Sequence, residues 1–100
     1  MITIEITEDN DRLFLEASGH ALSDTKGKDL ICCGISVLLQ AMELNFPEYS
    51  KRGEGYQRIE VKGPTAEQKI VWDAYIDPVI MFAKDFPENI FLKNIQFGGE

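Results

Sequence analysis

Residues 2–7 read Ile-Thr-Ile-Glu-Ile-Thr, and this stretch decides the fold. The isoleucines recur at every second position, the period that places them on one face of a half-buried strand. A polar cluster at residues 8–11 follows, and alternation resumes through residues 13–17. Because short polar clusters form turns between paired strands, the pattern predicts an antiparallel hairpin over residues 2–18.

The period changes beyond residue 29. Apolar residues then recur at three- and four-residue spacing, the stripe of an amphipathic helix. These residues are Ile31, Ile35, Leu38, Leu39 and Met42. We expect a helix that has Asp29 as its N-cap and reaches about Leu44.

A second strand and a second helix follow. Residues 48–55 are polar, with two glycines, and are expected to form a connection, whereas residues 56–62 alternate as a strand. Thr65 and Gln68 have the spacing of a capping box, which predicts a helix start, and Pro78 is expected to kink that helix. The apolar residues that indicate this helix are Ile70, Val71, Ala74, Tyr75, Val79 and Phe82.

The last segment, residues 90–97, is rich in β-forming residues, and its apolar phase shifts between Leu92 and Ile95, which predicts a bulge. The expected order is ββαβαβ, within a single domain over residues 1–100. The fold class is α+β, with two layers in which two helices pack on a mostly antiparallel sheet. The pattern leaves the strand order open.

Composition excludes several classes of protein. The net charge is −7 and the basic residues are scattered, so we expect no direct nucleic-acid binding. We also expect no signal peptide and no membrane span, because no apolar run approaches the roughly 20 residues that a span requires. The two cysteines are adjacent and offer no disulfide framework, and such thiols suit a reducing, cytoplasmic compartment.

His20 and Cys32 are the residues best suited to nucleophilic and acid–base catalysis. His20 follows the predicted hairpin, and Cys32 falls in the first turn of the predicted helix, where unpaired N–H groups and the helix dipole favour a thiolate. A nearby imidazolium would lower the thiol pKa further and could protonate a leaving amine. The pair is therefore a candidate Cys-His dyad, and Ser36 lies one helical turn beyond Cys32.

Simpler roles exist for the same residues. A cysteine near a helix start is commonly a small core residue, and we predict this role for Cys33. Asp29 could act only as a cap, and Ser36 could bond back to a helical carbonyl. His20 and the two cysteines supply at most three ligands, so we expect no metal site, and no motif calls for a cofactor.

Residues 18–21, Ser-Gly-His-Ala, residues 27–32, Gly-Lys-Asp-Leu-Ile-Cys, and Ser36 together resemble the signature of the ribosomal-processing cysteine protease family. The resemblance implies a cytoplasmic endopeptidase, homodimeric and without cofactor. Its substrate would be a short N-terminal extension of a large-subunit ribosomal protein, the twenty-seventh in the usual numbering. An acidic enzyme suits such a basic partner.

By the same resemblance, His20 and Cys32 are the catalytic pair, Asp29 and Ser36 support it, and the segment from Gly19 to Gly27 is a loop over the peptide. Cys33 and Gly34 stand where family members commonly have alanines. In a helix, Gly costs up to about 1 kcal/mol relative to Ala. The alternative, from another class, is a non-catalytic ribosome-assembly or peptide-binding module that uses the same cleft without turnover.

Overall fold

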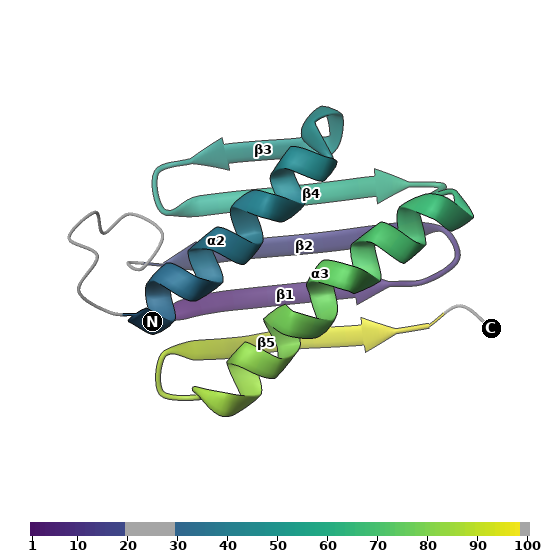
Figure 1. Cartoon of the computed structure of the whole chain (residues 1–100). Helices are drawn as coiled ribbons and strands as arrows, with labels where there is room; N and C mark the ends of the chain where they lie inside the picture. Colours follow the sequence, from purple (N-terminus) through teal and green to yellow (C-terminus); the bar gives the residue numbers. More distant parts are fainter. Residues whose placement is uncertain (20–29, 99–100) are drawn as a thin grey trace.

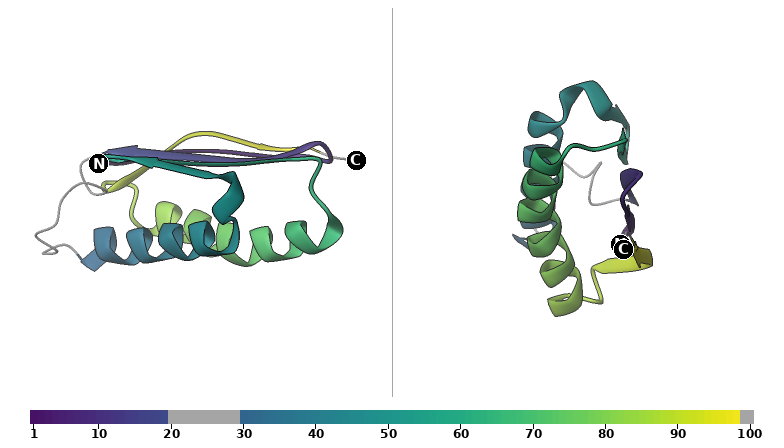
Figure 2. Two further views of the ribbon diagram at one scale, coloured as in Figure 1. Left: turned by 90° about the horizontal axis from the view of Figure 1, so that it is seen from above. Right: turned by 90° about the vertical axis from the view of Figure 1, so that its right-hand side faces the viewer.

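The computed structural model describes the backbone of residues 1–19 and 30–98, with side chains up to Gly19 and from Cys33 onward. The elements, in chain order, are β1 (Ile2–Glu8), β2 (Arg12–Gly19), α2 (Leu30–Asn45), a short 3-10 helix η1 (Pro47–Tyr49), β3 (Ser50–Gly53), β4 (Tyr56–Lys62), α3 (Ala66–Asp85) and β5 (Ile90–Phe97). Both helices lie on one face of the sheet (Figures 1 and 2). The predicted two-layer α+β architecture is confirmed.

The described strands form one five-stranded sheet in the order β3-β4-β2-β1-β5. The predicted hairpin of β1 and β2 is antiparallel, and Ile4 lies opposite Ala17. The β2–β4 and β3–β4 pairs are also antiparallel, and only β1 and β5 run parallel. The predicted bulge is present in β5, because Leu92 pairs with Ile4 whereas Asn94 pairs with the next residue, Glu5.

The core lies between the sheet and the two helices. The isoleucines of β1 are fully buried, as the alternation predicted. From the helices, the buried side chains are Ile35, Leu39 and Met42 of α2 and Trp72, Ile76, Val79 and Ala83 of α3. The Trp72 ring meets Phe46 edge to face, with centroids 5.6 Å apart. This packing closes the core beyond the C-terminal end of α2.

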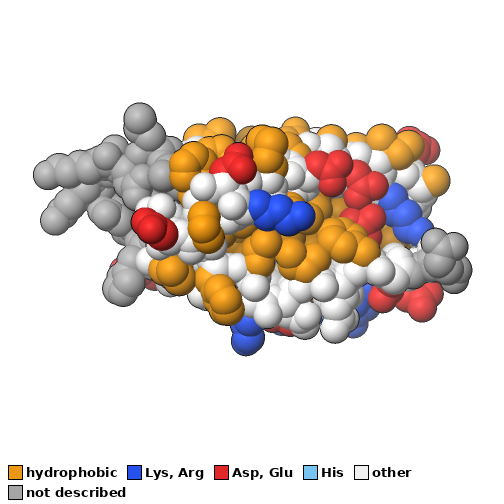
Figure 3. Space-filling model, turned by 90° about the horizontal axis from the view of Figure 1, so that it is seen from below, with side chains coloured by type: hydrophobic (Ala, Val, Ile, Leu, Met, Phe, Trp, Pro, Cys, Tyr) orange, Lys and Arg blue, Asp and Glu red, His pale blue; other side chains and the backbone are white. Residues whose placement is uncertain are grey.

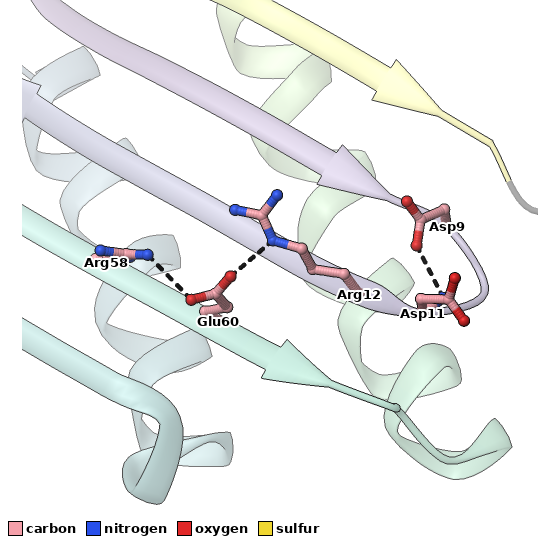
Figure 4. A network of polar contacts seen from close by, with 5 residues as sticks. All are labelled: Asp9, Asp11, Arg12, Arg58 and Glu60. Atoms are coloured by element: carbon pink, nitrogen blue, oxygen red, sulfur yellow. Dashed lines mark hydrogen bonds and ion pairs between the residues drawn. The ribbon is translucent and has the colours of Figure 1, made fainter.

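The outer face of the sheet carries an ionic network in place of a helix layer (Figure 4). Arg12 Nε donates to Glu60 over 2.7 Å, and an Arg58 nitrogen lies 3.0 Å from the same carboxylate. The Arg12 guanidinium also lies 4.3 Å from the centroid of the Phe14 ring. Phe14 is therefore only 6% exposed, although no described helix covers it.

The predicted capping box starts α3. The Gln68 N–H donates to Thr65 Oγ1 over 3.1 Å, and the Thr65 N–H donates to Gln68 Oε1 over 2.9 Å. The helix then runs unbroken to Asp85, with Pro78 inside it. Neither described helix has the length and apolar character that a membrane crossing requires.

Three local expectations were wrong. Residues 50–53 form the edge strand β3, where only a connection was expected. The buried side of α3 passes through Trp72 and Ile76, and Ile70, which had indicated the helix, is 70% exposed. Cys33 is exposed and is not a core residue, because the buried stripe of α2 follows Ile35 and its neighbours at helical spacing.

The side of the molecule formed by β5 and α3 is partly apolar. Figure 3 shows apolar side chains gathered there, with basic and acidic side chains among them. On these elements Met81, Phe91 and Phe97 are each more than half exposed. Lys93 lies within the same edge strand, and a lysine of this kind discourages unspecific pairing of strand edges.

Gly34 lets the two helices approach each other closely. A Cβ at this position would lie 2.6 Å from Cζ of Phe82 on α3, closer than carbon atoms pack. The Phe82 ring also contacts Phe86, with centroids 5.4 Å apart. The glycine that lowers helix propensity in α2 therefore makes room for an aromatic ring of α3.

We expect Gly34→Ala to lower the free energy of unfolding by about 1 kcal/mol, because the cost of displacing the Phe82 ring exceeds the gain in helix propensity. In a Phe82→Leu background the same change should raise stability by about 0.5 kcal/mol. Urea unfolding followed by Trp72 fluorescence measures both differences. A loss of stability in both backgrounds would show that Phe82 is not the reason for the glycine.

Candidate active site

The first turn of α2 places the candidate nucleophile. The helix begins at Leu30, so the backbone of Cys32 is third in the helix, as predicted with a cap at residue 29. Its first turn contains no acidic residue, and the free N–H groups there favour an anion. His20, Gly27 and Asp29 lie outside the described residues.

Gly19 ends β2 at the same end of the sheet as the start of α2 (Figure 1). Its φ is +138°, and a Cβ there would overlap the carbonyl oxygen of Met1. Its N–H donates to the carbonyl of Gly55 over 3.1 Å. Only glycine fits this position, so the chain leaves the sheet from a fixed point just before residue 20.

A small polar pocket of about 40 Å³ lies beside α2. Its lining comes from α2, β3 and β4, and consists of Ser36, Gln40, Arg52, Gly53, Tyr56 and Gln57. Ser36 is one helical turn from Cys32, so the pocket adjoins the predicted nucleophile position along the helix. The hydroxyl, amide and guanidinium groups of the lining can bind polar parts of a peptide.

One polar contact holds the rim of the pocket, and a second lies behind it on the outer face of the sheet. Arg52 of β3 binds Glu43 of α2, with its Nη2 and Nε atoms 2.9 and 3.0 Å from Oε1 of the carboxylate. The Tyr56 hydroxyl donates to Glu16 Oε2 over 2.8 Å, and this bond to an anion raises the pKa of Tyr56. The first contact ties α2 to β3, and the second ties β4 to β2.

Gln57 forms the inner wall of the pocket. Its side chain is buried, and its Nε2 donates to the carbonyl oxygen of Leu39, in the middle of α2, over 2.8 Å. Unlike these two contacts, this bond lies inside the molecule. It connects the strand that lines the pocket directly to the helix that carries Cys32.

Sequence reasoning found Ser36 but missed the rest of the pocket. Arg52 and Gly53 belong to β3, where the sequence predicts only a connection, and Gln57 is one polar residue of an alternating strand. One signal was present in the sequence. Glu54-Gly55 is a two-residue turn between paired strands, and Gly55 has a positive φ, which glycine adopts without strain.

A second group of ionisable side chains lies away from this pocket, where the end of β1 meets α3. Burial, followed by the carboxyl groups of Asp73 and Asp77, raises the pKa of Glu8 to about 7, while Lys69 opposes the rise. Glu8 hydrogen-bonds Asp73, and its Oε1 is buried without a partner. Within the described residues, no group of three or more His, Cys, Asp or Glu could hold a metal ion.

Comparison with known proteins adds the family context. The model of a family described as cysteine protease Prp matches residues 1–90 of the chain. A crystal structure of an essential ribosomal processing protease Prp from S. aureus, in complex with a covalently linked product peptide, is 21% identical, with a TM-score of 0.75. The match covers 94% of this chain and 99% of that one.

Two further solved structures share the fold. The same S. aureus protease in complex with a substrate peptide has a TM-score of 0.73 at 20% identity, over 94% of this chain and 99% of that one. SMU.848 from Streptococcus mutans has a TM-score of 0.70 at 20% identity, over 98% of this chain and 95% of that one. No curated protein matches the sequence.

The Glu8 cluster predicts a pH dependence of stability. The folded-state pKa of about 7 exceeds the ordinary value of 4.5, so folding favours the protonated form. The stabilising contribution is complete below pH 4.5 and is lost as the pH rises through about 7. Above that pH, Glu8→Gln should be more stable than the parent by about 1 kcal/mol. This difference is smaller than the whole pKa shift would imply, because the carboxyl is only partly buried and solvent screens its charge.

Urea midpoints of both proteins between pH 4 and pH 8 check this expectation, and Glu5→Gln on the other face of β1 is the control. Parallel stability curves for the parent and Glu8→Gln would contradict it.

Proposed function

Because the chain belongs to the Prp cysteine protease family, we propose that it is a cysteine endopeptidase with Cys32 as the nucleophile and His20 as its general base. One observation of the structure supports this assignment most. The backbone of Cys32 lies in the first turn of α2, where helix N–H groups lower a thiol pKa. The 90 matched residues include both proposed catalytic positions.

The proposed reaction is acyl transfer in two steps. The Cys32 thiolate attacks the scissile carbonyl carbon, N–H groups of the first turn stabilise the oxyanion, and the carbon–nitrogen bond breaks as His20 gives a proton to the leaving amine. Water then attacks the thioester with His20 as base, which releases the carboxylate product and restores the thiol. No metal or cofactor takes part in this scheme.

Supporting roles follow from position and family motif. We propose that Asp29 caps α2 and helps to orient His20, and that Ser36 contributes its hydroxyl to the pocket beside the nucleophile. The segment from Gly19 to Gly27 would cover the bound peptide. The conformation that only glycine adopts at Gly19 directs the chain into this segment.

The proposed substrate is the N-terminal extension of the twenty-seventh large-subunit ribosomal protein, processed in the cytoplasm. Two observations support it. The solved relatives are named as ribosomal processing proteases, one of them with a substrate peptide. The net charge of −7 on this chain favours encounter with a basic ribosomal protein and disfavours direct nucleic-acid binding.

We expect the purified chain to shorten this extended ribosomal protein, as measured by intact mass. Cys32→Ala and His20→Ala should each lower the cleavage rate at least about 1000-fold, because they remove a reacting group. Cys33→Ala is the matched control and should cleave at nearly the parent rate, since Cys33 is exposed on the adjacent helix position.

Cleavage by Cys32→Ala at the parent rate would rule out the proposed nucleophile. Tight binding of the extension by a parent that never cleaves it would instead favour the non-catalytic binding module.

We further propose that the protein is a homodimer whose interface uses the exposed apolar side chains of β5 and α3. A chain of 100 residues buries a modest core, so a second copy adds useful burial.

Sedimentation should give twice the chain mass for the parent. A double variant that carries both Phe91→Glu and Met81→Glu should sediment with the mass of a single chain. A parent that sediments as one chain at micromolar concentration would contradict this part of the proposal.

A further inference from the structure

Gln57 is the one polar side chain that the described part of the protein buries almost completely, at 3% exposure. It occupies the first inward position of β4, and the other two inward positions are apolar, Ile59 and Val61. A buried amide is costly unless it is hydrogen-bonded. The contact that satisfies it is the bond from Nε2 to the carbonyl oxygen of Leu39.

The formation of α2 does not require this bond. Leu39 lies in the middle of α2, where a carbonyl already accepts the helical bond from four residues ahead, and Gln57 uses its second lone pair. A methionine at position 57 would remove only the donor, and the Leu39 carbonyl would keep its helical bond, so no buried group would be left without a partner. The side chain would still fill the same space in the core.

The bond instead restricts the position of α2 along its own axis. Ile35, Leu39 and Met42 hold α2 against the sheet by apolar contact, which does not select one position along the helix axis. A hydrogen bond does, because it weakens steeply with distance and angle. The Gln57 amide projects from β4, which is paired on both sides, so the donor belongs to the rigid centre of the sheet.

The position that is fixed in this way is also that of the nucleophile. Residues 32, 36 and 39 follow one another at four- and three-residue spacing along one side of α2, and residue 32 is about 10 Å along the axis from residue 39. A slip of α2 by one residue would move Cys32 by about 1.5 Å. Misplacement of about 1 Å can cost on the order of 100-fold in rate.

We propose that Gln57 is a positioning residue for peptide cleavage: its bond to the Leu39 carbonyl fixes α2 along the sheet and thereby holds Cys32 in place for attack. The inference rests on the proposed peptidase function. Gln57 takes no part in the chemical steps. Because it also lines the pocket beside Ser36, the same side chain sets the distance between the pocket wall and the helix.

Two variants test this role in the full chain, with a synthetic peptide of the ribosomal-protein extension as substrate. Gln57→Met keeps the size of the side chain and removes the donor, and we expect kcat to fall roughly 10- to 100-fold while KM changes little. Its urea midpoint should equal or exceed that of the parent. Lys62→Met, at the exposed end of the same strand β4, is the control and should keep the parent kcat.

Gln57→Glu supplies the second readout. Its carboxyl has a proton to donate to the Leu39 carbonyl only when protonated, so its kcat relative to the parent should recover as the pH falls. The same ratio for Gln57→Met should stay flat with pH. Because an ionised carboxylate at this buried position also lowers stability, kcat is divided by the folded fraction measured at each pH by Trp72 fluorescence. A role confined to stability would leave no pH-dependent difference between the two variants after this division.

The outcomes are separable. A parent that does not cleave the peptide overturns the proposed function and this inference with it. A cleaving parent with an equally active Gln57→Met overturns this inference alone, as does a Gln57→Met whose activity falls only in proportion to its folded fraction. A Gln57→Met that does not fold also overturns it, because the position would then be required for stability.

Discussion

The placement of α2 on the inner face of the sheet is the constraint on which the rest of the molecule depends. Apolar burial supplies the attraction, because the β1 isoleucines must be covered, but burial alone leaves the helix free to slide. The Gln57 bond to the Leu39 carbonyl removes that freedom, and the close approach of Phe82 to Gly34 sets the distance between α2 and α3. The start of α2 and the polar pocket beside it then have fixed places at one end of the sheet.

The fold could be predicted where one face of an element is apolar and the other is polar. The alternation in β1, the stripe of α2 and the capping box of α3 each had a local cause, and the structure contains all three. Prediction was poor where that contrast was weak. In α3, apolar residues occur around much of the helix, so Ile70 indicated the helix but not its buried side, which tertiary packing through Trp72 determines. The strand β3 is short, exposed and polar, and it forms only because β4 offers it a partner.

The candidate site also has parts that the sequence predicts and parts that it does not. The positions of Cys32 at a helix start and of Gly19 before His20 follow from local sequence, and they suffice to identify the family motif. The pocket does not follow, because three separate elements supply its lining and their adjacency depends on strand order. Gly34 shows the same limit. As a departure from the family pattern it predicted a weaker helix, whereas in the structure it accommodates the Phe82 ring.

The most direct test of the account is to trap the covalent intermediate. The parent is mixed with the extended ribosomal protein, quenched with acid within the first turnover, and digested for peptide mapping by mass spectrometry. If Cys32 is the nucleophile, the digest contains a thioester between the Cys32 sulfur and the new carboxyl end of the released extension, and this thioester is absent from Cys32→Ala. Substrate cleavage with no adduct at Cys32, or with an adduct at Cys33, would contradict it.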